Sequence, residues 1–433
     1  MTIMNKYVSV EKAIAFVKPG DKLFIQTAPA APQQLIKALA ARANNLNNIT
    51  IYQMHTEGDA PYAAPGKENT FNVNCFFIGA NLRKAVQEGR AQYISVFLSE
   101  IPTLFRQKII QIDVALIHVS TPDEHGYCSL GVSVEIAPAV LETAKYIIAQ
   151  VNPNMPRTTG DSFIRQSKID AMVAVNDNIL EAVVETPDET DYKITDYVAS
   201  SIKDGATLQM GIGKIPNAVL NELISHRRLG IHTGMFSDGF INLIEEGIIA
   251  GEMKKTRRYK VVSSFMMGTK LLYNFVHNNP MIEMLDIAHV NATNIIRKNR
   301  NLTAINSALE VDITGQVWAD SIGSKMYSGV GGQIDFMRGA SLSEGRKPII
   351  ALRSVTNKGL SKIVSVLKLG VGAVTIRAHV HYVVTEYGIA HLYGKNLFEG
   401  AKALIKIAHP AHRQRLEKDA HEIAAFYKHQ ILT

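Results

Sequence analysis

The chain has few of the features that mark secreted or membrane proteins. Only two of its 433 residues, Cys75 and Cys128, are cysteines, so no disulfide framework is expected. No apolar run approaches the roughly 20 residues that a membrane helix needs. The first residues, MTIMNKYVSVEKA, lack the apolar stretch of a signal peptide. These features predict a cytoplasmic protein without a membrane segment.

Charge is also sparse and shows no strong clustering. Charged residues make up 20% of the chain, and the formal net charge is +7. The densest basic runs, 254–258 and 297–300, are not interleaved with aromatic residues, and no nucleic-acid-binding motif is visible. We therefore expect no nucleic-acid partner. The positive excess suits either a solvated surface or contacts to the phosphates of a small ligand.

Apolar runs alternate with amphipathic helical patterns from one end of the chain to the other. The strand-like runs are 22–26, 49–54, 114–119, 171–175, 207–211, 261–266, 349–352 and 382–385, and the main helical patterns are 32–43, 134–146, 216–226 and 240–250. This alternation predicts an α/β fold with parallel or mixed sheets flanked by helices. Such sheets bind ligands at the carboxyl ends of their strands.

A polar stretch with a proline, residues 185–191, is typical of a linker. It predicts one domain at residues 1–190 and a second at residues 191–433. Each half contains a strand, a Gly/Pro-containing turn and a helix, at 22–43 and at 207–226. The two domains are therefore expected to have related architecture.

Two glycine-containing segments are candidates for ligand contact. One is the turn with Gly211 and Gly213, and the other contains Gly329, Gly331 and Gly332. Glycine lets a ligand approach the backbone closely, and a following helix offers free N–H groups to an anion. A purely structural turn explains either segment equally well.

The side chains that resemble catalytic or metal sites are ambiguous. The clusters at 123–128, 379–381 and 386–391 contain His, Asp, Glu or Cys, but none has a complete four-ligand spacing, so no metal is predicted. Cys75 lies in an apolar run typical of the core. Glu57 directly follows a strand, where an α/β site recruits carboxylates, although a solvated loop also explains it.

Several segments together resemble the acetyl-CoA hydrolase/transferase family, and are most similar to its 4-hydroxybutyrate CoA-transferases. They include IGKIPNAVL, LGIHTGMFSDGFINLIEEG, AINSALEVDITGQVWADSIGSKMYSGVGGQIDFMRGA, VVTEYGIAHLYGK and IAHPAHRQRLE, with TPDEHGYCSLG and VNPNMPRTTGDSFI in the first half. The seven segments occur in the family's order, and the resemblance extends over nearly the whole chain.

The resemblance implies two related CoA-transferase-type domains with the active site in the cleft between them. A glutamate attacks an acyl-CoA, and the intermediate becomes a glutamyl-CoA thioester that a second carboxylate then accepts. Acyl-CoA and a carboxylate are thus the implied substrates, with no permanently bound cofactor. The resemblance also implies a homodimer or a higher homo-oligomer.

The resemblance also implies roles for particular residues of this chain. Gly211 and Gly213 would form the acyl and oxyanion side of the pocket. The residues associated with CoA contact would be Asn306, Glu310, Gly331, Gly332 and Lys358.

The chain departs from the family pattern at its centre. The family reads HTEMFSDG where this chain reads HTGMFSDG, so Gly234 stands at the position of the nucleophilic glutamate. Glycine has no side chain to acylate, and Glu57 is a candidate substitute. Three readings are open: a CoA-transferase that is altered or inactive, a glutamate-independent decarboxylase or hydrolase of CoA thioesters, and a non-catalytic acyl-CoA-binding protein.

Overall fold

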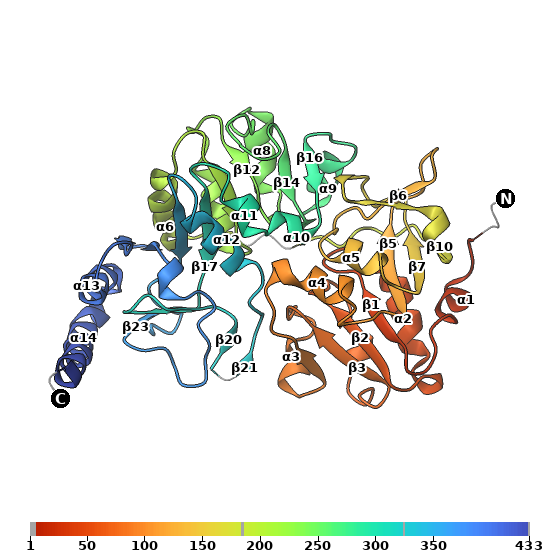
Figure 1. Cartoon of the computed structure of the whole chain (residues 1–433), viewed down its shortest axis with the longest axis horizontal. Coiled ribbons are helices and arrows are strands. Elements are labelled where there is room, and N and C mark those ends of the chain that lie inside the picture. The colour runs from red at the N-terminus through yellow and green to blue at the C-terminus, as the bar shows by residue number, and fades with distance from the viewer. Residues whose placement is uncertain (1–5, 183–185, 324, 432–433) are drawn as a thin grey trace.

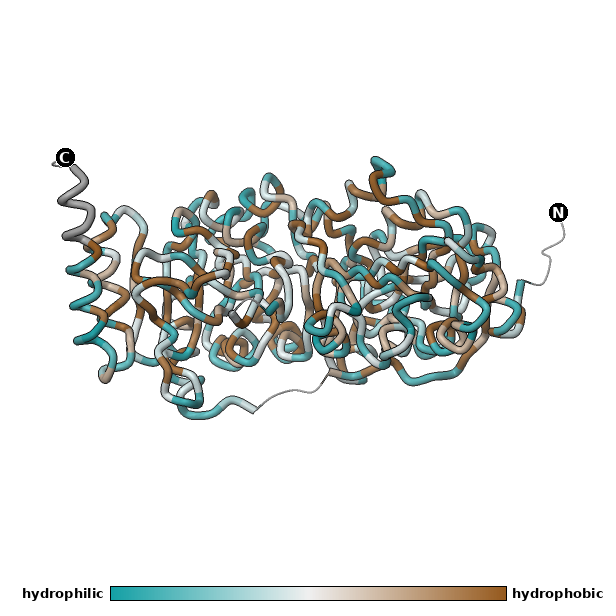
Figure 2. The backbone as a smooth tube through the Cα atoms, turned by 90° about the horizontal axis from the view of Figure 1, so that it is seen from below, coloured by the Kyte–Doolittle hydropathy of each residue, from teal (hydrophilic) through white to brown (hydrophobic). Residues whose placement is uncertain are grey.

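The computed structural model describes residues 6–182, 186–323 and 325–431. These residues form two α/β halves that lie side by side along the long axis of the molecule, with the C-terminal helical pair at one end (Figures 1 and 2). The predicted α/β class with parallel and mixed sheets is confirmed. No helix of the described ranges is long and apolar enough to cross a membrane.

The N-terminal half is built on a seven-stranded sheet in which every neighbouring pair is parallel. In sheet order the strands are β10 (Ala171–Ala174), β7 (Tyr146–Val151), β5 (Val114–Val119), β1 (Lys22–Ile25), β2 (Ile49–Gln53), β3 (Phe71–Cys75) and β4 (Ala91–Tyr93). Its helices are α1 (Val10–Ile14), α2 (Gln33–Ala41), α3 (Arg83–Gln87), α4 (Ile101–Arg106) and α5 (Ala137–Leu141). All six residues of β5 are buried, as expected for a central parallel strand covered on both faces.

The C-terminal half contains a six-stranded sheet that is parallel except for its last strand. In order the strands are β12 (Gly230–Ile231), β11 (Thr207–Met210), β17 (Thr303–Ser307), β22 (Lys347–Ala351), β24 (Tyr382–Thr385) and β25 (Gly388–His391). The helices are α6 (Glu189–Ser201), α7 (Lys214–Asn221), α8 (Gly239–Glu245), α9 (Lys270–Val276), α10 (Ile287–Val290), α11 (Thr293–Ile296), α12 (Gln333–Ser341), α13 (Leu397–Ile407) and α14 (Pro410–Ile431).

Short strands join the halves and shape the loops around the site. A three-stranded sheet combines β8 (Thr159–Gly160) of the first half with β16 (Ile282–Met284) and β14 (Val261–Ser263) of the second. The remaining pairs and triplets are β13 (Met235–Phe236) with β15 (Phe265–Met266), β18 (Glu310–Asp312) with β19 (Val317–Trp318) and β23 (Ile363–Val364), β20 (Ser321–Ile322) with β21 (Lys325–Met326), and β6 (Tyr127–Ser129) with β9 (Phe163–Arg165). The two halves are therefore held together partly by strand pairing.

The buried core also crosses between the halves. One apolar cluster covers a single face of the first sheet, with Leu23, Ile51 and Leu116 among its members. The other cluster runs from Phe24 and Ile117 on the opposite face into the C-terminal half. Because apolar burial is the main favourable term in folding, this continuous cluster fixes the halves against each other.

Several expected boundaries differ from the structure, including the helices expected over 216–226 and 240–250, which end at Asn221 and Glu245. The helix expected over 134–146 is wrong in its second half, because α5 ends at Leu141 and Tyr146 begins β7. The single strand expected over 261–266 is divided into β14 and β15, which belong to different sheets. In the expected linker, residue 185 lies outside the described residues, while Asp188 caps α6 through a capping box and residues 189–191 form its first turn. The division at residue 190 stays a prediction.

One buried carboxyl at the interface between the halves gives the fold a pH dependence. Glu135 is fully buried; its backbone amide donates to Ser264 O at 3.2 Å and its carbonyl accepts from Ile287 N at 3.0 Å. Burial raises the pKa of Glu135 to about 8, although Thr27 Oγ1 donates to the carboxyl at 2.6 Å. Since the folded pKa exceeds the unfolded one, the stability this group contributes is complete below about pH 4 and is lost as the pH rises through about 8.

We expect Glu135→Gln to remove this pH dependence, because glutamine keeps the shape and cannot ionise. The variant should match the unaltered chain near pH 5 and exceed its free energy of unfolding by about 3 kcal/mol near pH 8. Urea unfolding at both pH values measures the difference. Glu245→Gln, at an exposed position of α8, is the matched control. Its free energy of unfolding should equal that of the unaltered chain at both pH values. The same change in free energy of unfolding with pH for Glu135→Gln and for the unaltered chain would contradict the raised pKa of Glu135.

Candidate functional site

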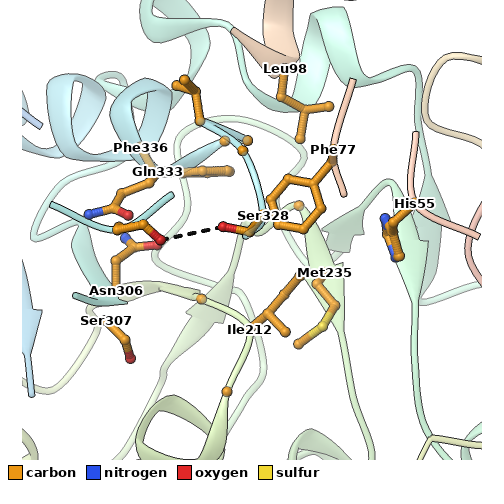
Figure 3. A pocket seen from close by; sticks show the side chains of 18 of the residues that line it. His55, Phe77, Leu98, Ile212, Met235, Asn306, Ser307, Ser328, Gln333 and Phe336 are labelled. Atoms are coloured by element: carbon orange, nitrogen blue, oxygen red, sulfur yellow. Dashed lines mark hydrogen bonds between the residues drawn. The ribbon is translucent and has the colours of Figure 1, made fainter. Parts of the chain in front are cut away.

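A cavity of about 450 Å³ lies between the two halves. The N-terminal half contributes Met54, His55, Phe77, Arg83 and Leu98, which follow strands β2, β3 and β4 or lie on α3. The C-terminal half contributes the residues after β11 and β17, the segment at Gly234, and residues 327–333. The cavity thus opens at the carboxyl ends of parallel strands, where α/β folds bind ligands. In Figure 3, His55 and Phe77 approach from one side, while Asn306 and Gln333 lie on the other.

The structure brings most of the candidate residues together in this cavity. Those that line it are Gly211, Gly213, Gly234, Asn306, Gly331 and Gly332. Asn306 is buried and donates through Nδ2 to Gln209 Oε1 at 2.9 Å, so the polar groups at the ends of β11 and β17 hold each other in place. Gly213 precedes the first turn of α7.

Three other candidates lie outside the lining of this cavity. Glu310 follows the lining residue Leu309, is 7% exposed, and binds Lys368 Nζ at 2.6 Å. Lys358 is exposed in the turn that ends at Gly359. Glu57 is partly buried; burial raises the pKa of its carboxyl, while Arg83 opposes that shift. The roles suggested for these three residues stay predictions.

Residues 327–332, hereafter the glycine loop, are held by the opposite half of the protein. Ser328 O accepts from Ile78 N at 2.8 Å, Gly331 O accepts from Leu98 N at 3.2 Å, and Val330 N donates to the Tyr93 hydroxyl at 3.0 Å. In addition, Arg83 Nε donates to Tyr327 O at 3.1 Å, and its guanidinium carbon lies 3.8 Å from the centre of the Tyr327 ring. The loop keeps its shape only when both halves are docked.

Two glycines of the loop are required by their surroundings. Gly331 has φ +57°, in the left-handed region that side chains disfavour. At Gly332, a Cβ would lie 2.5 Å from Asn291 Nδ2, so only glycine allows Asn291 to approach. Gly331 is therefore required by its backbone conformation, and Gly332 by the close approach of the Asn291 side chain.

Position 234 is firmly fixed and open on its cavity side. The carbonyl of Gly234 accepts from Ser264 N and Phe265 N, both at 3.1 Å, and from Ser263 Oγ at 3.0 Å. A Cβ at this position would meet Asn291 Oδ1 at 3.7 Å and Phe336 Cε2 at 3.8 Å, which are ordinary contacts. A Cβ would therefore fit at this position without displacing its neighbours.

Asn291 belongs to a polar group that bridges the halves. Its Nδ2 donates to Asp335 Oδ2 at 3.0 Å, and Asp335 also accepts from Ser99 N at 3.1 Å and Ser99 Oγ at 2.8 Å. Burial raises the pKa of Asp335 to about 6, and these donors oppose the shift. Asn291 Oδ1 has no hydrogen-bond partner among the described residues. An acceptor without a donor therefore lies beside position 234.

His55 is a buried titratable side chain in the wall of the cavity. It is 5% exposed, its ring lies 5.8 Å from that of Phe77 and 5.4 Å from that of Phe265, and burial lowers its pKa to about 4. It is therefore a neutral imidazole at physiological pH, part of a largely apolar wall with Met54, Leu98 and Met235. Such a wall suits a small apolar acyl group.

The sequence did not single out the residues that the first half contributes, nor Asn291. His55 lies two residues before Glu57, and Phe77 lies in the apolar run that contains Cys75, so their positions near strand ends were a usable signal. Asn291 offers no such signal, because its position in the site depends on contacts with Asp335 and Gly234, which are 44 and 57 positions away in the chain. Among the described residues, no group of three or more His, Cys, Asp or Glu could hold a metal ion.

Comparison with known proteins agrees with this architecture. The acetyl-CoA hydrolase/transferase N-terminal domain matches residues 2–185, and the C-terminal domain of the same family matches residues 268–420. A succinyl-CoA:acetate/propanoyl-CoA:succinate CoA transferase of Fasciola hepatica is 51% identical, covering 95% of this chain and 86% of that protein. A 4-hydroxybutyrate coenzyme A transferase of Clostridium kluyveri is 46% identical, and the match covers 95% of this chain and 96% of that protein.

A solved structure supports the same conclusion. The crystal structure of 4-hydroxybutyrate CoA-transferase from Porphyromonas gingivalis superimposes with a TM-score of 0.84 at 39% identity, covering 96% of this chain and 97% of that one. The match extends over both halves and therefore includes the cavity between them. The chain belongs to the acetyl-CoA hydrolase/transferase family.

Proposed function

We propose that the cavity binds small acyl-CoA thioesters and that the protein acts in the transfer of CoA between an acyl-CoA and a carboxylate. The observation that carries this proposal is the cavity itself, in which an apolar wall from one half faces two glycine-containing turns from the other. Relatives at 46% and 51% identity are named CoA-transferases, which supports the same chemistry.

In this proposal the two sides of the cavity have different tasks. The turn at Gly211 and Gly213 contacts the acyl carbonyl, and the glycine loop with Asn306 contacts the CoA arm. Backbone amides suit this purpose because they stabilise developing negative charge without a side chain that must be ordered. Gly234 stands where the attacking glutamate would be. Because glycine has no carboxylate, this chain forms no glutamyl-CoA thioester at that position. CoA is a substrate and not a resident cofactor.

The two candidate substitutes for the nucleophile are Asp238, four residues after position 234, and Glu57, in the opposite half. Asp238 accepts from Thr269 N at 3.0 Å and from Thr269 Oγ1 at 2.6 Å, and it does not line the cavity. An attacking carboxylate must reach within about 3–3.5 Å of the thioester carbon. Glu57 does not line the cavity either, but Asp238 is held by Thr269, so Glu57 remains the better of the two candidates. A cytoplasmic location, suggested by the composition, and a two-fold homodimer, suggested in part by the family resemblance, belong to this proposal.

Calorimetry with acetyl-CoA tests the binding. We expect saturable binding to the unaltered chain, and Gly332→Leu should weaken it by about tenfold or more, because its Cβ would overlap Asn291 Nδ2 and displace the loop. Gly372→Ala is the matched control: its Cβ meets nothing within 4 Å, and the affinity should not change. No binding to the unaltered chain at millimolar acetyl-CoA would refute the proposal.

A further inference from the structure

The cavity between the halves contains one charged side chain in its lining. Of the described residues that line it, only Arg83 is charged at neutral pH, because burial lowers the pKa of His55 to about 4 and no carboxylate or lysine belongs to the lining. A positive charge in an otherwise neutral and largely apolar cavity attracts an anion, because the surrounding low-dielectric walls focus its field. Arg83 therefore marks a place in the cavity for an anionic group.

Arg83 is held in place by Tyr327 without using all of its donors. It begins α3 of the first half, which packs against β21 of the second half (Figure 1). Its Nε donates to Tyr327 O at 3.1 Å, and its guanidinium carbon lies 3.8 Å from the centre of the Tyr327 ring. The terminal nitrogens Nη1 and Nη2 have no hydrogen-bond partner among the described residues, and neither is shielded from solvent. One side of the guanidinium is thus fixed, and its end is accessible.

The described part of the chain supplies no carboxylate to the accessible end of Arg83. Glu57 is close enough for Arg83 to oppose the rise that burial causes in the pKa of its carboxyl, but the two form no ion pair and Glu57 does not line the cavity. Other cations of the C-terminal half are neutralised internally: Lys214 and Arg353 each bind Asp191 at 2.7 Å. The charge of Arg83 is therefore available to a ligand.

The accessible end of the guanidinium suits a carboxylate. Two N–H groups side by side match the two oxygens of one carboxylate, in the bidentate geometry that distinguishes arginine from lysine. The phosphates of CoA offer similar oxygens, but they carry several negative charges, whereas the lining of the cavity offers one positive charge. A carboxylate has about four acceptor positions, so one that is bound by Arg83 still has lone pairs free.

We propose that Arg83 is the specificity-determining residue for the free carboxylic acid that exchanges with acyl-CoA. Its Nη1 and Nη2 bind the carboxylate, while Phe77 and Leu98 of the same cavity wall contact the carbon chain. A neutral compound of the same shape binds poorly, because it covers the guanidinium without supplying an anion, and burying an uncompensated charge is costly. This inference rests on the proposed transfer of CoA to a carboxylate, and it assigns the residue that recognises that carboxylate.

Calorimetry with 4-hydroxybutyrate, in the absence of CoA, tests the assignment. We expect saturable binding of the acid to the unaltered chain, and Arg83→Met should weaken it by about tenfold or more, because two charge-assisted hydrogen bonds are lost. Arg83→Lys keeps the charge without the paired donors and should recover part of the affinity. The neutral amide, 4-hydroxybutyramide, should bind the unaltered chain more weakly than the acid does.

Two controls separate recognition of the acid from damage to the structure. Lys84→Met removes the neighbouring cation of α3, whose side chain is 83% exposed, and should bind the acid as the unaltered chain does. Acetyl-CoA should bind Arg83→Met and Arg83→Lys with nearly the affinity of the unaltered chain. The reason is that hydrogen bonds from Ile78 N and Leu98 N, and one to the Tyr93 hydroxyl, still hold the glycine loop.

The outcomes distinguish this inference from the proposed function. If Arg83→Met binds the acid as tightly as the unaltered chain, or if the unaltered chain binds acid and amide equally, the inference fails and the binding of acyl-CoA stands. If Arg83→Met weakens the binding of acetyl-CoA and not that of the acid, Arg83 serves a phosphate of CoA, which also overturns the inference. Absence of acetyl-CoA binding to the unaltered chain overturns the proposed function, and the titration with the acid then decides the role of Arg83 separately.

Discussion

Gly234→Glu is expected to create CoA exchange between acetyl-CoA and 4-hydroxybutyrate. The introduced carboxylate starts from a backbone fixed by three hydrogen bonds, and its Cβ has contacts no closer than 3.7 Å. A nucleophile tethered beside the thioester has a very high effective concentration, so we expect a gain of at least roughly 1,000-fold over the unaltered chain.

The exchange assay has a direct covalent readout. Mass spectrometry of Gly234→Glu after incubation with acetyl-CoA should show a CoA adduct on the peptide that contains residue 234, and borohydride should trap it. Gly234→Gln has almost the same shape without the nucleophile, and should give neither adduct nor exchange. A CoA adduct on the unaltered chain would show that another group, such as Glu57, attacks. If Gly234→Glu binds acetyl-CoA but gains no exchange activity, a glutamate at position 234 is not sufficient for exchange, and other differences from the family pattern must also matter.

Asp191→Ala is expected to lower the stability of the C-terminal half substantially. Asp191 is 1% exposed and accepts from Arg353 Nε at 2.8 Å, from Arg353 Nη2 at 2.7 Å and from Lys214 Nζ at 2.7 Å. Removing one member of a buried ion pair leaves its partners without compensation. We therefore expect the free energy of unfolding to fall by about 3 kcal/mol.

The pH dependence of this group gives an independent check. Burial would raise the pKa of Asp191, but hydrogen bonds from Arg353 and Lys214 outweigh it and lower the pKa to about 2. Its contribution is thus present above about pH 4 and is lost as the pH falls through about 2. Urea unfolding at neutral pH measures the main effect. Asp196→Ala, at an exposed position of the same helix, is the control and should change stability by less than about 0.5 kcal/mol. Equal losses for both would mean that the cluster with Arg353 adds nothing.

The sequence predicted the strands better than it predicted the helices between them. The run 114–119 coincides with β5 and the run 382–385 with β24, because buried parallel strands are continuous apolar runs of limited length. The expected helix 134–146 failed where an apolar segment became β7, since periodicity alone does not distinguish a short buried strand from a buried helix.

The candidate site could be predicted only in part, for a physical reason. Glycines indicate tight turns from local sequence alone, so the sequence identified Gly211, Gly213, Gly331 and Gly332 as candidates. The structure places all four in the lining of one cavity. The opposite wall depends on which distant segments pack together. Phe77 reaches the glycine loop across about 250 residues of chain, a contact that local pattern does not encode. The proposed catalytic roles stay predictions until they are measured.

The hydrogen bonds that hold the glycine loop have a thermodynamic consequence. Since Ile78, Tyr93 and Leu98 of one half fix the loop of the other, separating the halves dismantles the cavity in the same step. A ligand that binds only the assembled cavity must then oppose separation by RT ln(1 + [L]/Kd), whatever else holds the halves together. By this linkage, acyl-CoA supply would tune how rigidly the two halves are joined, whether or not the bound thioester reacts.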